Sequence, residues 1–190
     1  MAKQKKEDER KFWILWAILG TIAFALSLLA DGYVNGLFNA EKPQLLNSFF
    51  SIITNFGFDI AVLFFIPIIL LYNKKQKKLV HSLLLALISS IAASFILKAI
   101  FAKTRPDTIL SYPIQIIDYS FPSMHSAVAF ASLPILARNL KYARYFTIFA
   151  VLVAFSRLYL GFHYLSDIVF GAFAGYLIGR LSIRAVEKWQ

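Results

Sequence analysis

The residues of this chain that could carry out chemistry gather in three short segments, and the last of them, 156–167, is the most informative. Within it, His163 and Asp167 are four positions apart, so at the start of a helix they share a face and the carboxylate can accept a proton from the ring. That pairing would fix the tautomer of the imidazole and leave its other nitrogen free as a nucleophile. A purely structural histidine–aspartate pair is the alternative, but a carboxylate that opens so apolar a stretch is costly without a partner.

The second segment reads Phe-Pro-Ser-Met-His-Ser over residues 121–126. A proline and a serine before an apolar run predict the start of a helix, whose free backbone N–H groups and positive dipole end attract anions. His125 would lie in the first turn, where it could donate a proton to a leaving oxygen. The alternative is an ordinary helix cap followed by a histidine at the membrane interface.

The first segment, 98–106, carries two cations seven residues apart, Lys98 and Arg105, followed by Pro106. Residues at this spacing lie about two turns apart on one helix face, so both cations can approach one anion. Pro106 disfavours helical geometry at the residue before it and therefore predicts a helix end there. Alternatively, the lysine extends to the lipid headgroups and the arginine binds lipid.

Taken together, the three segments describe a site for phosphoryl transfer. Lys98, Arg105 and Arg157 would neutralise the phosphate oxygens, because charge develops on them in the transition state. His163 would attack phosphorus and His125 would protonate the departing oxygen. Water would then release the phosphohistidine, with His125 acting as the base.

The composition indicates which elements must position these residues. Hydrophobic residues make up 59% of the 190 residues and charged residues 16%, whereas soluble domains average about 45–50% and about 25%. Without cysteine there is no disulfide, thiolate nucleophile or cysteine-ligated metal. The net charge of +10 is dispersed between apolar runs and forms no basic stripe, which argues against a nucleic-acid partner.

A bilayer core is crossed by about 20 mostly apolar residues in a helix. Six such runs predict an all-α integral membrane bundle in a single domain: 12–30, 58–72, 79–101, 124–137, 145–159 and 165–183. Residues 31–55, with an apolar patch at 45–53, could form an interfacial helix between the first two spans. The first run is longer than the apolar part of a signal peptide, so we expect it to be a retained span.

Basic residues predict the orientation. With six spans, all but five of the 20 Lys and Arg residues fall on the side of the two termini, including the basic tail 1–11. Such an excess marks the cytoplasmic side, so both termini are expected there and the motif-bearing region 98–167 is expected to be extracytoplasmic. The five exceptions are Lys42, Lys98, Lys103, Arg105 and Arg157. Lys103 is expected to hold substrate or contact headgroups, and Asp59 to cap a helix or pair with a site cation.

These residues resemble the type-2 phosphatidic acid phosphatase family, the lipid phosphate phosphatases, which share an active site with vanadium haloperoxidases. The motifs of that family read K-x6-R-P, P-S-G-H and S-R-x5-H-x3-D. The matching positions are Lys98, Arg105 and Pro106, then Pro122, Ser123 and His125, then Ser156, Arg157, His163 and Asp167. Met124 stands where the family has glycine.

The resemblance implies His163 as nucleophile, Asp167 as its orienting partner and His125 as acid, with no metal or other cofactor. It also implies that Lys98, Arg105, Arg157, Ser123 and the backbone of Met124 hold the phosphate. The side chain of Met124 would reshape the pocket and so affect substrate choice.

The function expected from these observations is a membrane lipid phosphatase without an obligate protein partner. Its substrate would be a polyprenyl diphosphate or phosphatidylglycerol phosphate, with phosphatidic acid as a close competitor. Vanadate-dependent halide oxidation would use the same residues, but a membrane-spanning chain argues against it. A non-catalytic lipid-phosphate binder or transporter is the other alternative, and it would have no need of His163.

Overall fold

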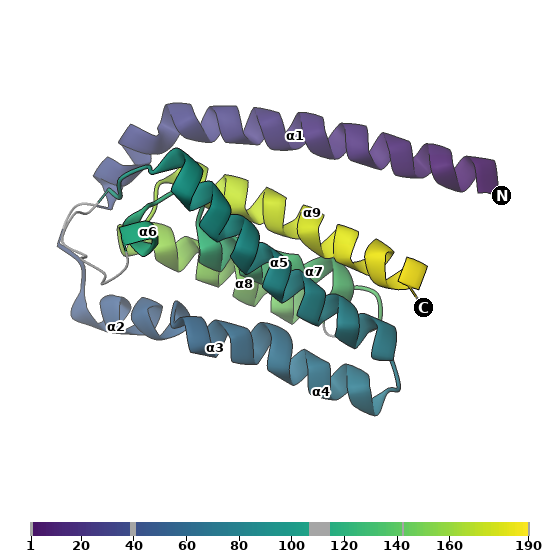
Figure 1. Ribbon diagram of the computed structural model, residues 1–190. Coiled ribbons are helices and arrows are strands. Elements are labelled where there is room, and N and C mark those ends of the chain that lie inside the picture. Colours follow the sequence, from purple (N-terminus) through teal and green to yellow (C-terminus); the bar gives the residue numbers. More distant parts are fainter. Residues whose placement is uncertain (1, 39–40, 107–114, 142, 190) are drawn as a thin grey trace.

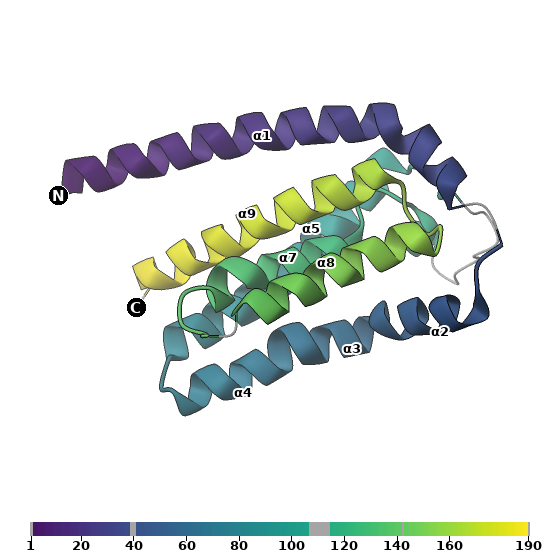
Figure 2. The same cartoon turned by 180° about the vertical axis from the view of Figure 1, so that it is seen from behind.

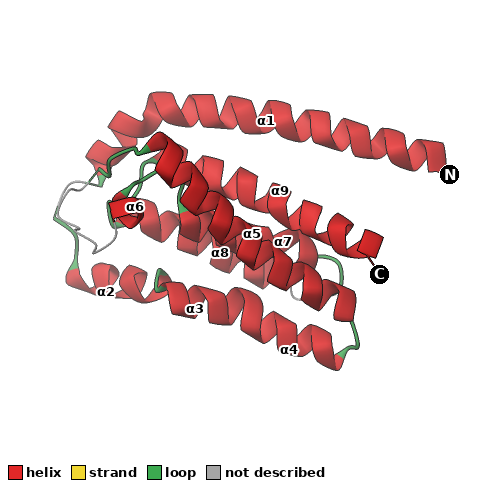
Figure 3. Cartoon of the chain, viewed as in Figure 1, coloured by secondary structure: helices red, strands yellow, loops and turns green. Residues whose placement is uncertain are grey.

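In the computed structural model the described residues are 2–38, 41–106, 115–141 and 143–189, and no strand occurs among them (Figures 1 and 3). The expected all-helical class is therefore confirmed for this part of the chain. The helices are α1 (Ala2–Leu37), α2 (Gln44–Ile53), α3 (Phe56–Ile60), the π-helical turn η1 (Ala61–Phe65), α4 (Ile66–Asn73), α5 (Lys77–Phe101), α6 (Gln115–Asp118), α7 (Met124–Leu136), α8 (Ala143–Tyr159) and α9 (Leu165–Trp189). Residues 107–114 of the expected catalytic region lie outside the described ranges.

Four stretches within the described residues are long and apolar enough to cross a bilayer: Glu9–Leu37, Phe56–Asn73, Lys77–Phe101 and Leu165–Trp189. The remaining two expected spans correspond to α7, with 13 residues, and α8, with 17. Both are shorter than the roughly 20 residues that a full crossing needs. Six spans with cytoplasmic termini therefore stay a prediction.

Helix α1 extends well beyond the expected 12–30, because the basic tail continues the helix and the C-terminal end runs on to Leu37. It lies along α9 in both views of the ribbon (Figures 1 and 2). Trp16 stacks on Tyr176 with ring centroids 4.6 Å apart, and Arg184 pairs with Glu9 at 2.8 Å. Phe24 also packs on Phe170, with ring centroids 5.5 Å apart, so α1 contacts the motif-bearing helix along much of its length.

The close approach of α7 and α9 decides where the site lies. Gly175 on α9 faces the backbone of Ala127, and a Cβ there would lie 2.1 Å from the Ala127 carbonyl oxygen. Only glycine allows the two backbones to approach this closely at this position. Small residues commonly serve this purpose where helices pack in membranes. The same contact brings the first turns of the two helices together, where the Ser123 N–H donates to the Asp167 carbonyl at 3.1 Å. The second and third motifs therefore meet.

The chain from α2 to α4 forms a bent rod, with a break at Thr54 and Asn55. The Asn55 side chain accepts a hydrogen bond from the Phe58 N–H at 3.1 Å and so caps α3. Asp59 does not act as the expected cap, because its buried carboxylate accepts no hydrogen bond from the described residues. A helix, α2, does follow α1 as expected, and after the break at Thr54 and Asn55 the chain continues into α3. Phe50 of α2 packs on Tyr159 of α8, with ring centroids 4.5 Å apart.

Candidate active site

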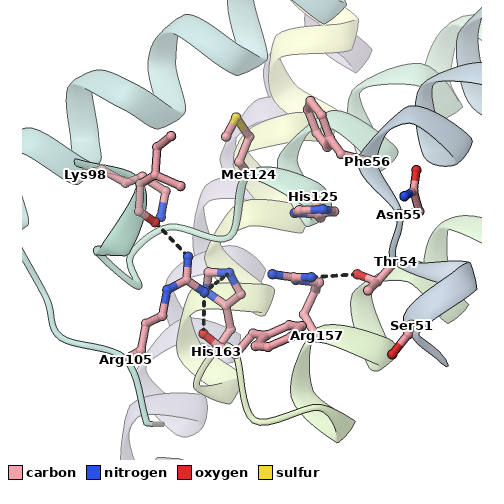
Figure 4. Close-up of a pocket in the computed structure, with 12 residues that line it drawn as sticks. Ser51, Thr54, Asn55, Phe56, Lys98, Arg105, Met124, His125, Arg157 and His163 are labelled. Atoms are coloured by element: carbon pink, nitrogen blue, oxygen red, sulfur yellow. Dashed lines mark hydrogen bonds between the residues drawn. The ribbon is translucent and has the colours of Figure 1, made fainter. Parts of the chain in front are cut away.

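The three sequence motifs converge on one cavity of about 460 Å³ at the end of the bundle near α6 (Figure 4). Five of the expected side chains line it, together with Met124 and residues from the α2–α3 break. The lining is Ser51, Thr54, Asn55, Phe56, Lys98, Arg105, Ile117, Met124, His125, Arg157, Phe162 and His163. Cations and histidines face the cavity, and none of the carboxylates in the described part of the chain lines it, so this lining suits an anion.

His163 lies between Asp167 and the cavity. Its Nδ1 is 3.5 Å from Asp167 Oδ2, longer than a typical hydrogen bond, and its Nε2 is 3.4 Å from Arg105 Nη1. Hydrogen bonds between catalytic groups are often long before substrate binds. A proton on Nδ1 facing the carboxylate leaves the lone pair of Nε2 directed toward the cavity, and Figure 4 shows the ring beside Arg105.

Burial lowers the pKa of His163 well below its ordinary value, and the charges of Arg157 and Arg105 lower this pKa further. The hydrogen bond and the charge of Asp167 act in the opposite direction. The ring is 2% exposed, and its environment on balance disfavours the imidazolium form. His163 is therefore a neutral imidazole near pH 7, the form that can act as a nucleophile.

Asp167 sits behind the cavity wall and is fully buried. It is the third residue of α9, and its Oδ2 accepts a hydrogen bond from the N–H of Tyr164, just before the helix, at 2.9 Å. This is one half of a capping box, so the start of α9 itself orients the carboxylate. The Ser120 hydroxyl donates to the same oxygen.

Arg105 is held by backbone carbonyls around it. Its Nε donates to Asp118 at 3.0 Å, and its Nη1 and Nη2 donate to Phe162 and Ile117, each at 2.8 Å. Lys98, 2% exposed, donates to the carbonyl of Tyr119. Both cations of the first motif are thus fixed in direction, which limits the rearrangement needed when an anion binds.

Arg157 comes from the end of α8 and is 4% exposed. Its Nη1 donates to the Thr54 hydroxyl at 2.8 Å, and its guanidinium lies 4.3 Å from the centroid of the Phe162 ring. His125, in the first turn of α7, has the edge of the Phe56 ring against it, with centroids 5.0 Å apart. In Figure 4 both groups border the same space as His163.

Sequence reasoning missed the wall supplied by Ser51, Thr54, Asn55 and Phe56. The available signal was the polar pair Thr54–Asn55, which interrupts two apolar runs. A polar break inside a membrane segment is tolerated where the backbone lines a cavity. That signal could have marked the position, but nothing in the spacing identifies Arg157 as its partner.

One expected phosphate ligand, Ser123, lies away from the cavity wall, and so does Lys103. The Ser123 hydroxyl is fully buried and caps α7 by accepting from the Ser126 N–H at 3.5 Å. Lys103 was expected to reach substrate or headgroups, but its Nζ lies 2.9 Å from Asp167 Oδ1 on the far side of that carboxylate. Lys103 therefore contacts Asp167, the partner of His163, and does not face the cavity.

The model of the PAP2 superfamily matches residues 79–190. An undecaprenyl-diphosphatase of Sulfolobus acidocaldarius is 27% identical, covering 91% of this chain and 90% of its own. The undecaprenyl-diphosphatase BcrC of Bacillus subtilis is 28% identical, covering 80% of this chain and 79% of its own.

Two solved structures share the fold. LpxE of Aquifex aeolicus superposes with a TM-score of 0.66 and 26% identity, covering 81% of this chain and 94% of that one. A transmembrane PAP2-type phosphatidylglycerolphosphate phosphatase of Bacillus subtilis superposes with a TM-score of 0.71 and 23% identity, covering 93% and 96%.

Proposed function

The chain belongs to the PAP2 superfamily and is a phosphate ester hydrolase of the membrane, and we propose that it converts a polyprenyl diphosphate to the monophosphate through a phosphohistidine on His163. The observation that carries the proposal is the cavity in which Lys98, Arg105 and Arg157 face His125 and His163. A terminal phosphate placed there would contact all three cations and lie beside Nε2 of His163.

In the first step, Nε2 of His163 attacks the terminal phosphorus in line with the bridging oxygen. The bond from phosphorus to that oxygen breaks. His125, which is protonated once the negative charge of the bound phosphate lies beside it, gives its proton to the departing lipid monophosphate. The phosphorylated ring keeps its proton on Nδ1, where Asp167 stabilises the positive charge that forms. The three cations neutralise the negative charge on the phosphoryl oxygens.

In the second step, neutral His125 takes a proton from water, and the water oxygen attacks the phosphorus of the phosphohistidine. The bond from phosphorus to nitrogen breaks, which releases inorganic phosphate and returns His163 to the neutral form. His125 is again protonated and ready for the next lipid. Both steps use the chain's own side chains.

The substrate class is supported by the two undecaprenyl-diphosphatases, which align over 80% and 91% of the chain. Phosphatidylglycerol phosphate and phosphatidic acid present the same terminal phosphate and compete as substrates. With six spans and cytoplasmic termini, the positive-inside rule places the cavity on the extracytoplasmic face. A lipid would then enter from the outer leaflet with its headgroup toward Arg105.

The test is phosphate release in detergent with EDTA present, comparing the wild type with His163→Ala on all three lipids. We expect release by the wild type, fastest from the polyprenyl diphosphate, and none by His163→Ala. His81→Ala is the matched control, because His81 lies at the start of α5 and does not line the cavity. Equal activity in His163→Ala would refute the phosphohistidine, and faster release from another lipid would reassign the substrate.

A further inference from the structure

The described part of the chain contains a charged cluster on the far side of Asp167 that the proposed mechanism leaves unused. Its members are Asp31, Lys103 and Ser166, from three separate elements. Lys103 Nζ lies 2.9 Å from Asp167 Oδ1, 3.4 Å from Asp31 Oδ2 and 3.0 Å from Ser166 Oγ. None of the three residues lines the cavity.

We propose that Asp31 and Lys103 are positioning residues that hold Asp167, and through it His163, in the geometry required for attack on phosphate. This rests on the proposed role of His163. Through Asp31, helix α1 supports the active site from outside the cavity, although α1 precedes the segment 79–190 that the family model matches.

The Lys103 side chain points away from the cavity. Helix α5 ends at Phe101, and the next residue, Ala102, has a left-handed φ of 43°. Lys98 and Arg105, on either side of this turn, face the cavity, whereas Lys103 contacts Asp167 behind it. A cation five residues from one proposed phosphate ligand and two from another is thus withheld from the substrate.

Asp31, from α1, contacts the first turn of α9. The Asp31 carboxylate accepts from the Ser166 N–H at 2.8 Å and from the Ser166 hydroxyl at 2.5 Å. Ser166 is the second residue of α9, so its N–H is among those left without a partner inside the helix. Asp31 therefore caps α9 from another helix, with its negative charge at the positive end of the helix dipole.

Lys103 and Asp31 also determine how much of the Asp167 charge acts on His163. Asp167 is fully buried, and a buried carboxylate is stable only with charged or hydrogen-bonding partners. The Lys103 ammonium partly offsets its charge, so the proton affinity that Asp167 confers on His163 is limited. Asp31 in turn shares the Lys103 charge. The other charged or titratable groups acting on His163 are Arg105, Arg157 and His125, all on the cavity side.

These charges predict that two substitutions affect the pKa of His163 differently. In Lys103→Met the Asp167 charge is no longer offset, so the imidazolium is stabilised and this pKa rises. In Asp31→Asn the full Lys103 charge acts on Asp167, so this pKa does not rise. A merely structural role would expose the ring in both variants and move its pKa upward toward 6.5 in both.

The experiment is an NMR titration of the full-length protein in detergent micelles, labelled with ¹⁵N-histidine. The chain has three histidines, and His163→Ala assigns the relevant signal. Glu9→Gln is the matched control, because Glu9 also joins α1 to α9, through an ion pair with Arg184, but lies in the opposite half of α1. We expect a raised His163 pKa in Lys103→Met, none in Asp31→Asn and none in Glu9→Gln.

Kinetics supply the second readout. A positioning residue lowers kcat with little change in KM, and misplacement of a reacting group by about 1 Å lowers rates about 100-fold. We expect such a fall in Lys103→Met, a smaller one in Asp31→Asn and recovery in Lys103→Arg, which restores the cation. A raised KM with unchanged kcat in Lys103→Met would mean that Lys103 contacts substrate, and the inference would be wrong.

Two further outcomes distinguish a wrong inference from a variant that does not fold and from a wrong proposed function. Asp31→Asn preserves shape and an acceptor for Ser166, so it carries the test if Lys103→Met does not fold, and a kcat equal to that of Glu9→Gln would overturn the inference. If the wild type releases no phosphate from any lipid, the proposed function fails, whereas the titration still tests the inference because it requires no turnover.

Discussion

Arg157 and Thr54 are 103 residues apart in sequence, and the guanidinium Nη1 donates to the threonine hydroxyl at 2.8 Å. This contact joins the end of α8 to the break between α2 and α3, on the wall of the cavity. It aligns a cation of the third motif with help from a segment outside all three motifs.

Replacing Thr54 with valine therefore tests whether this alignment matters. Thr54→Val keeps the shape but removes the acceptor, and hydrogen bonds to charged groups contribute about 1.5–3 kcal/mol. We expect kcat/KM for lipid phosphate to fall about tenfold, since about 1.4 kcal/mol corresponds to a factor of ten. Thr147→Val is the control, because that exposed hydroxyl on α8 bonds only within its own helix, to Ala143. Equal kcat/KM in both variants would contradict the prediction.

The contact between α7 and α9 is expected to be intolerant of a methyl group. In Gly175→Ala the new Cβ would lie 2.1 Å from the Ala127 carbonyl, so the helices must separate. Overpacking of this kind costs about 1–3 kcal/mol and should lower the unfolding temperature in detergent.

Gly32→Ala is the matched control for this change, because no described atom outside the neighbouring turns of α1 lies within 4 Å of a Cβ at that position. Alanine favours the helix by up to about 1 kcal/mol over glycine, so stability should stay equal or rise. A Gly175→Ala variant as stable as Gly32→Ala would show that the helices separate without cost.

The protonation state of His163 gives a prediction about acid pH. Burial lowers the pKa of His163 to about 3, so the neutral ring persists as pH falls through the ordinary value near 6.5. The nucleophilic form is lost only closer to the folded-state pKa. In the substrate-free wild type, the ¹⁵N signals of this ring should still be those of a neutral imidazole at pH 5. A titration midpoint near 6.5 would contradict the environment described for His163.

Replacing Met124 with glycine tests whether the phosphate site uses the backbone or the side chain of this residue. If only its backbone N–H serves the phosphate, Met124→Gly should still release phosphate from lipid. The variant should be somewhat less stable, since the side chain packs against the core. Its relative rates on the three lipids should change, because Met124 lines the cavity. Complete loss of release in a folded variant would show that the side chain itself is required.

The sequence by itself determined the helical class and the approximate ends of most helices, and it identified the three motifs, whose chemistry is proposed from their residue types. Apolar runs specify membrane-length helices because lipid requires the backbone to satisfy its own hydrogen bonds. The four-residue spacing of His163 and Asp167 sufficed to place them together, although His163 lies just before α9 and only Asp167 lies in its first turn. These features depend on interactions between residues close in sequence.

Only the tertiary structure decided which groups surround those motifs. The direction of Lys103 depends on the turn at Ala102 that follows α5, and the contacts of Asp31 and Thr54 depend on helices that pack across the molecule. The contacts of Asp31 with Ser166 and of Thr54 with Arg157 join residues 135 and 103 positions apart, where spacing carries no information. Packing of α7 on α9 through Gly175 selects one arrangement of the helices, and with it the partners of Asp167 and Arg157.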